Sequence, residues 1–242
     1  MAAFNPETFR ITNAPESVYY VRNFITIEDE KYLLNRIDKT PALKWTQLSN
    51  RRLQNWGGLP KPSGMIAEKI DPWLMKFLDR VNSLKIFEDK MANHILLNEY
   101  KPGQGIMPHL DGDLFYPTIS TISLGSHTVM HFYEQDLGEE NNVKSLHERR
   151  VCSLFIEPRS LLVLKNDMYN KYLHGIEEVS EDTLGSNIAR LPEGSSIGSQ
   201  MQRGIRYSLT IRNVPKTSKI KFKFGKWFWK RLKLFDNIKR FP

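Results

Sequence analysis

The C-terminal half of this chain reads as a series of short strands, and this pattern limits the possible folds more than any other feature. Residues 93–100, 118–133, 152–164 and 204–214 are apolar or alternating, and Gly, Pro and polar turns separate them. We take 152–164 as two strands that pair with each other across a turn. About eight strands are expected in all.

Two helices are predicted before these strands. Thr26 can cap the first, because three acidic residues follow it in what would be the first turn. Asp71 can cap the second, with Pro72 at its first position. Two helices followed by strands predict an α+β, mainly β protein, in which N-terminal helices support an antiparallel sandwich or jelly roll.

Composition predicts one core. The chain has 242 residues, of which 40% are hydrophobic, and this suffices for one domain, expected at 1–215. No apolar run is long enough for a transmembrane helix, and the N-terminus does not resemble a secretory signal. Cys152 lies alone in an apolar segment, so we expect a small core residue in a reducing compartment. We expect the protein in the cytoplasm and nucleus. We also predict that it is a monomer.

The excess positive charge lies at the C-terminus. Residues 216–242 contain ten Lys or Arg and one acid, so of the whole chain's 35 basic and 27 acidic residues, 25 and 26 remain in the body. We treat 216–242 as a basic aromatic tail. It could bind nucleic-acid phosphate or an anionic surface, or it could pack on the body with its lysines in water.

Two polar segments have no clear period. Residues 44–64 interleave Trp, Arg and amide side chains. They are either a loop whose tryptophans pack on the core or a substrate lid with aromatics for stacking and arginines for phosphate. Residues 177–203 are rich in Ser and Gly and predict a long mobile loop.

A histidine and an acid two residues apart follow a Pro-Gly turn. If His109 and Asp111 lie on a strand, both side chains point to the same face and can hold one metal ion. A second histidine would complete two His and one carboxylate, the set that suits Fe(II) and leaves positions open for O₂ and a co-substrate.

Four histidines could supply the third ligand. His174 stands out because it follows a buried strand and precedes a glycine, where a strand end can present a side chain to a pocket. His147 lies in a polar loop, His127 near a turn and His131 within a strand. His94 also lies in a strand and is expected in the core or at the rim.

The segment 206–212 indicates an anion site. On a strand, Arg206, Ser208, Thr210 and Arg212 share one face. Two arginines on an inner face would be costly without anionic partners, and a dicarboxylate co-substrate supplies two. The alternative is an edge strand with both arginines in water.

The order of these motifs along the chain matches the order in a known enzyme family. Asn98, Tyr100 and a Pro-Gly turn precede His109 and Asp111, and the segments 117–125, 173–176 and 206–212 follow. Residues 91–214 thereby resemble AlkB-type Fe(II)/2-oxoglutarate dioxygenases. The N-terminal half, including 53–60, looks like the branch called the sixth AlkB homologue.

The resemblance implies a double-stranded β-helix, a form of jelly roll, with a catalytic core at about 91–215. It implies iron held by the catalytic residues His109, Asp111 and His174. It also implies a 2-oxoglutarate co-substrate that chelates the iron and is bound by Asn98, Tyr100, Arg206, Ser208 and Arg212. Ser208 stands where the family often has Asn. With O₂, such an enzyme releases succinate and CO₂ and hydroxylates a C–H bond.

For the substrate, the resemblance implies alkylated bases in single-stranded DNA or RNA, demethylated oxidatively. Asp113, Phe115 and Tyr116 could line the base pocket or pack at its rim. Two alternatives remain open: the same oxygenase chemistry on a protein or small molecule, and a nucleic-acid binding module with little catalysis.

Overall fold

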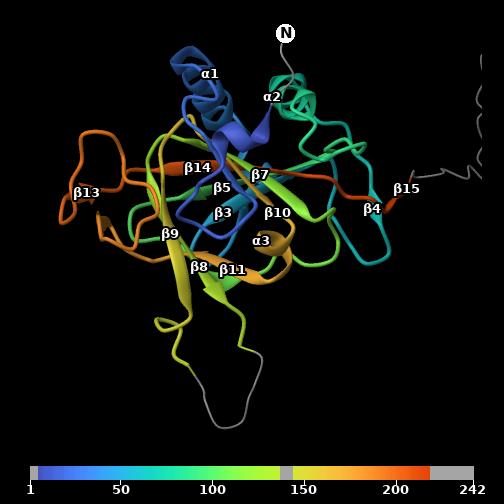
Figure 1. The fold of residues 1–242 in the computed structure, drawn as a ribbon. Coiled ribbons are helices and arrows are strands. Elements are labelled where there is room, and N and C mark those ends of the chain that lie inside the picture. Colours follow the sequence, from blue (N-terminus) through green and yellow to red (C-terminus); the bar gives the residue numbers. More distant parts are fainter. Residues whose placement is uncertain (1–4, 137–143, 219–242) are drawn as a thin grey trace, which may run out of the picture.

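The computed structural model describes residues 5–136 and 144–218, and two antiparallel sheets face each other in it (Figure 1). The large sheet has the order β1 (Val18–Val21), β10 (Leu161–Lys165), β7 (Thr118–Leu124), β14 (Arg206–Arg212), β5 (His94–Tyr100), β3 (Arg52–Trp56), β2 (Thr46–Gln47). The small sheet has the order β6 (Ile106–His109), β11 (Tyr172–Ile176), β8 (Thr128–Glu134), β9 (Arg150–Ile156). This architecture confirms the predicted jelly roll.

Helices cover the outer face of the large sheet. Figure 1 shows α1 (Ile27–Asp38) and α2 (Pro72–Ser83) on the side away from β8 and β11. Thr26 and Asp29 form the expected capping box of α1, whereas Asp71 stands at the N-cap of α2 without a side-chain hydrogen bond. Short helical turns complete the described chain: η1 (Pro6–Phe9), η2 (Ala42–Lys44) and α3 (Asp167–Asn170). In the ranges described, no helix is both long and apolar enough to cross a membrane.

Successive side chains along the central strands point to opposite faces of the large sheet, and this gives the protein two separate hydrophobic cores. Leu209 and Ile211 of β14 join α1 and α2 in one apolar core. A second core lies between the sheets, where Phe132 and Leu154 face Leu162 and Leu164. Cys152 belongs to this second core, and burial raises the pKa of its thiol to about 11, which confirms a packing role.

Residues 44–64 follow the packing interpretation for Trp56, but they are not a loop throughout. Instead of a loop, they contain β2 and β3, and β3 pairs with β5 inside the large sheet. Trp56 is buried and packs edge-to-face on Trp73, with ring centroids 5.7 Å apart, as the packing interpretation expected. The strand was missed because Arg, Gln and Asn occupy it, and its position comes from pairing with β5.

The predicted pairing within 152–164 is wrong. Residues 150–156 form β9, which pairs with β8 in the small sheet, whereas β10 pairs with β7 and β1 in the large sheet. The turn at 157–160, with Arg159 at φ 62°, carries the chain from one sheet to the other. Local hydrophobicity does not indicate which strand will be the neighbour.

The prediction of a mobile loop at 177–203 is also wrong. The segment contains the paired strands β12 (Glu181–Thr183) and β13 (Gln200–Gln202). Its Leu184 and Ile188 pack on Val129 and Phe155 of the small sheet. Buried Asp182 and Arg203 also form a bidentate ion pair, with N–O distances of 2.6 and 2.7 Å.

Residues 216–218 are the described part of the predicted tail. Thr217 and Ser218 form β15 (Thr217–Ser218), which runs parallel to β4 (Met65–Ile66). The rest of the predicted basic aromatic tail lies outside the described residues.

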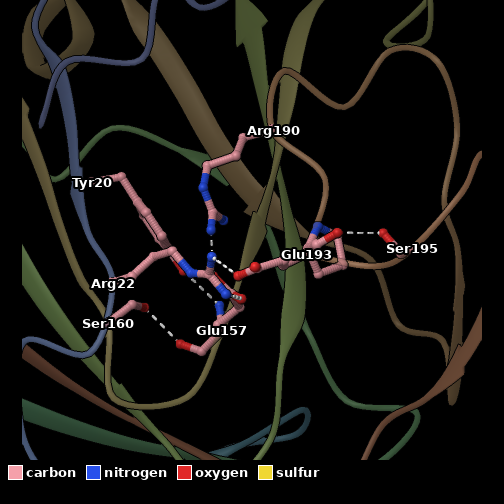
Figure 2. A network of polar contacts seen from close by, with 8 residues as sticks. Tyr20, Arg22, Glu157, Ser160, Arg190, Glu193 and Ser195 are labelled. Atoms are coloured by element: carbon pink, nitrogen blue, oxygen red, sulfur yellow. Dashed lines mark hydrogen bonds and ion pairs between the residues drawn. The ribbon is translucent and has the colours of Figure 1, made fainter.

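A polar network fastens the segment 177–203 to the end of the sandwich (Figure 2). Glu157 accepts hydrogen bonds from Arg190 at 2.7 Å, from Arg22 at 3.0 Å and from the Tyr20 hydroxyl at 3.2 Å. Arg22 also pairs with Glu193 at 2.8 Å. Because Glu157 is 18% exposed and contacts both arginines, it is the central member of the network.

Replacing Glu157 with Ala is expected to lower the free energy of unfolding by about 2 kcal/mol, because the partly buried Arg190 guanidinium loses its carboxylate partner and Arg22 and Tyr20 each lose a contact. Urea denaturation measures this change. Glu193→Ala is the control: its side chain is 81% exposed, so a loss of about 0.5 kcal/mol or less is expected. Equal losses in the two variants would contradict the central role of Glu157.

Candidate metal centre

The three predicted ligands converge between the two sheets. His109 ends β6 and stands opposite His174 of β11, with ring centroids 4.5 Å apart. Asp111 lies just beyond β6, and its Oδ1 is 3.8 Å from His109 Nε2 and 3.9 Å from His174 Nε2. One ligand atom from each of the three residues lies within 4.8 Å of the others.

Local backbone features hold this geometry. Gly112 turns the chain after Asp111 at φ 84°, and the Tyr169 hydroxyl donates to the Gly112 carbonyl at 2.6 Å. At Gly175 an added Cβ would lie 3.0 Å from the backbone nitrogen of Pro108. The glycine after His174 therefore lets β11 approach β6 closely enough for the two histidines to meet.

The protonation states suit a divalent metal. His109 Nδ1 donates to the Met107 carbonyl at 2.8 Å, because a carbonyl can only accept, and Nε2 is the ring nitrogen that faces Asp111. Burial lowers the pKa of His174 to about 4, so its imidazole is neutral at physiological pH. Burial alone would raise the pKa of Asp111, but the charge and the hydrogen bond of Arg212 oppose burial, and the pKa is lowered.

Arg212 fixes the orientation of the carboxylate. Its Nε donates to Asp111 Oδ2 at 2.7 Å, so Oδ1 remains directed toward the two histidines. The Arg212 guanidinium also packs on the Phe115 ring at 4.5 Å. Phe115 therefore packs at the rim of the site, which was one of its two predicted roles. Asp113 is exposed, and Tyr116 packs against the helix-side core.

The predicted co-substrate residues line one cavity beside the metal group. Asn98 and Tyr100 of β5 stand opposite Ser208 and Arg206 of β14. All four face the cavity together with Thr210, Arg212 and the two histidines, and its apolar walls include Ile119, Met130, Leu162, Leu164 and Ile176. Because β14 lies between β7 and β5, the edge-strand alternative for its arginines is wrong.

Arg206 is a buried cation without a carboxylate. It is 3% exposed, donates from one terminal nitrogen to Ser123 Oγ at 2.9 Å, and has no partner for Nε among the described residues. Burial lowers the pKa of its guanidinium to about 10, so it stays charged at physiological pH. A buried charge of this kind requires an anion, and the far carboxylate of a dicarboxylate ligand fits that requirement.

Comparisons with known proteins agree with this geometry. The model of the 2OG-Fe(II) oxygenase superfamily matches residues 19–212. The chain belongs to this superfamily. Its enzymes use Fe(II), 2-oxoglutarate and O₂, and the carboxylate with two imidazoles described above is a suitable donor set for iron.

Relatives of this 2OG-Fe(II) oxygenase span nearly the whole chain. The Danio rerio protein named "Probable RNA/DNA demethylase ALKBH6" is 46% identical over 91% of this chain and 95% of its own length. "Uncharacterized protein L905" of Acanthamoeba polyphaga mimivirus is 31% identical over 81% and 84%. The solved structure of OsALKBH1 shares the fold, with a TM-score of 0.53 at 12% identity over 81% of this chain and 98% of that one.

The other histidines of the oxygenase lie outside the metal group. His127 is 3.3 Å from Asp182, and His131 accepts or donates a bond with Ser153 Oγ at 2.8 Å. His147 is exposed in the β8–β9 connection, as predicted. Of the candidates for the third ligand, the structure therefore brings His174 to the site.

Sequence reasoning missed one residue of the cavity. Arg51, at the β2–β3 turn, lines the cavity and donates from Nε to Asn98 Oδ1 at 3.2 Å. The sequence carried no signal for this position, because the inward direction of Arg51 follows from the pairing of β3 with β5.

His94 offers a test of burial at this end of the site. It stands opposite Arg212 on the cavity side of β5, its Nε2 lies 3.3 Å from Asn55 Oδ1, and it is 1% exposed. Burial lowers its pKa from 6.5 to about 3. Between these values the unfolded chain binds a proton that the folded protein does not, so the folded state loses stability as pH falls.

For the metal-free protein, replacing His94 with Gln is expected to make the fall in unfolding free energy between pH 6.5 and 4.5 shallower, by up to about 1.4 kcal/mol per pH unit. Urea denaturation in the presence of a chelator at several pH values measures the slope. His147→Gln, at an exposed position, should leave the slope unchanged. An unaltered slope in His94→Gln would show that His94 is not held neutral by burial.

Proposed function

We propose that this oxygenase oxidatively demethylates alkylated bases in single-stranded DNA or RNA. The observation that carries the proposal is one cavity with a His-Asp-His group at one end and the uncompensated cation of Arg206 nearby. The choice of nucleic acid is supported by the relative named "Probable RNA/DNA demethylase ALKBH6".

In this proposal His109, Asp111 and His174 hold Fe(II). When bound, iron with 2-oxoglutarate and O₂ supplies the oxidising chemistry: the co-substrate loses CO₂ to become succinate, and one oxygen atom enters a substrate C–H bond. Burial keeps the His174 imidazole neutral, the Met107 carbonyl orients His109, and Arg212 orients the Asp111 carboxylate, while apolar walls around the reacting centre exclude water.

The two arginines of β14 have different tasks. Arg206 has no carboxylate partner and binds the far carboxylate of 2-oxoglutarate. Arg212 is already paired with Asp111, so it neutralises that carboxylate and contributes at the metal end of the co-substrate. Asn98, Tyr100 and Ser208 supply hydrogen bonds along the cavity between them.

For an N-methylated base the products follow from bond balance. Insertion of oxygen gives an N-hydroxymethyl group, whose C–N bond breaks as formaldehyde leaves and the nitrogen regains a proton. A base within a duplex would first have to leave the helix, which favours single strands as substrates. The basic tail adds phosphate affinity in this proposal. That role, the monomeric state and the location in cytoplasm and nucleus stay predictions.

The test is succinate release with Fe(II), 2-oxoglutarate, O₂ and a pool of single-stranded oligonucleotides carrying different methylated bases. We expect turnover stimulated by methylated over unmethylated strands, with one formaldehyde per demethylated base, and loss of both products in Asp111→Ala, which removes a metal ligand.

Other outcomes separate the alternatives. Turnover that no oligonucleotide stimulates would move the substrate to a protein or small molecule. Strand binding without turnover, despite bound iron and 2-oxoglutarate, would favour a binding module.

A further inference from the structure

Arg51 and Arg52 are neighbours with different environments. Arg52 lies on the outer face of the large sheet, where it makes a bidentate ion pair with Glu99 at 2.5 and 2.8 Å and packs on Trp45 at 4.1 Å. Arg51 points the other way, into the cavity, and its hydrogen bond goes to the neutral amide of Asn98. One arginine is therefore compensated and the other is not.

Arg51 and Arg206 flank the same stretch of β5. Arg52 pairs with Glu99 in register, which places Arg51 beside Tyr100 on one side, and Arg206 pairs with Tyr100 on the other. The Arg206 guanidinium lies 5.7 Å from the Tyr100 ring. In the described part of the chain neither Arg51 nor Arg206 forms an ion pair, so two cations without carboxylate partners line the same cavity on either side of β5.

The turn that carries Arg51 reaches from the large sheet to the small sheet. The backbone N–H of Leu48 donates to the Arg51 carbonyl at 2.9 Å, and this hydrogen bond closes the turn between β2 and β3. The Asn50 side chain then donates to the Glu178 carboxylate, two residues beyond the end of β11 in the small sheet. The turn thus connects the edge of the large sheet to the strand that carries His174.

We propose that Arg51 is a second carboxylate-binding residue of the co-substrate site. This inference rests on the proposed function, in which Arg206 binds the far carboxylate of 2-oxoglutarate. Arg51 binds the same carboxylate from the opposite side of Tyr100, because two guanidiniums match its two oxygens and its charge. Co-substrate binding then holds the β2–β3 turn in place over the cavity.

The direct test compares two keto acids that differ at the far end. 2-Oxoglutarate carries a carboxylate where 2-oxopentanoate carries a methyl group. Binding of each is measured by calorimetry on the full chain loaded with Mn(II) without O₂. For Arg51→Ala we expect a loss of about tenfold to hundredfold in 2-oxoglutarate affinity and no change for 2-oxopentanoate, with partial recovery in Arg51→Lys.

Arg52→Gln is the matched control. It removes the same charge one residue away on the opposite face. It should lower stability, because buried Glu99 loses its partner, and leave the ratio of the two affinities unchanged.

A second measurement follows the turn itself. Trypsin cleaves after Arg51 and Arg52, so 2-oxoglutarate should slow cleavage of the wild-type chain at this turn several-fold. In Arg51→Ala, cleavage after Arg52 should no longer depend on 2-oxoglutarate. Co-substrate-dependent protection that persists in Arg51→Ala would contradict the role of Arg51 in holding the turn.

The outcomes of the binding experiment separate this inference from the proposed function. If Arg206→Ala lowers the affinity for 2-oxoglutarate alone and Arg51→Ala lowers neither affinity, Arg51 is not a carboxylate ligand, while the site assignment stands. If Arg51→Ala weakens both keto acids equally, Arg51 acts by positioning Asn98. If it alters only oligonucleotide affinity, Arg51 contacts phosphate. If neither arginine variant lowers the affinity for 2-oxoglutarate more than the affinity for 2-oxopentanoate, the assigned carboxylate end itself is wrong.

Discussion

The buried ion pair between Asp111 and Arg212 is the interaction around which the site is arranged. Asp111 is 2% and Arg212 9% exposed at the side chain, and their 2.7 Å contact joins the end of the small sheet's β6 to the central β14 of the large sheet. Removal of either side chain would leave the other charge buried without its partner, which is strongly destabilising. Because Arg212 occupies Oδ2, Oδ1 is the oxygen that faces His109 and His174.

A polar interior of this kind needs support from apolar packing elsewhere. β14 supplies it within one strand: Leu209 and Ile211 are fully buried against α1 and α2, while Arg206, Ser208, Thr210 and Arg212 face the cavity. The helix-side core stabilises the sheet by burying apolar surface. The space between the sheets can then hold charged side chains at one end and an apolar cluster at the other.

Much of this arrangement could be predicted because it is local. The spacing of His109 and Asp111, and the alternation from Arg206 to Arg212, follow from two-residue strand periodicity. His174 could be preferred because a strand end followed by glycine presents a side chain. What failed depended on partners distant in sequence. The polar residues of β3 gave no strand signal, β9 and β10 belong to different sheets, and 177–203 is ordered through Leu184, Ile188 and the Asp182–Arg203 pair. Arg51 was missed for the same reason, since its inward position follows from the pairing of β3 with β5.

The central claim is that one cavity binds iron through His109, Asp111 and His174 and binds 2-oxoglutarate beside it. The most direct measurement is the visible absorption spectrum of the protein with Fe(II) and 2-oxoglutarate in the absence of O₂. Chelation of iron by the keto acid in this site predicts a metal-to-ligand charge-transfer band that is present in the wild type and in His147→Ala and absent in His174→Ala. A band that survives His174→Ala, or no band in a wild-type protein shown to bind both iron and 2-oxoglutarate, would contradict the account.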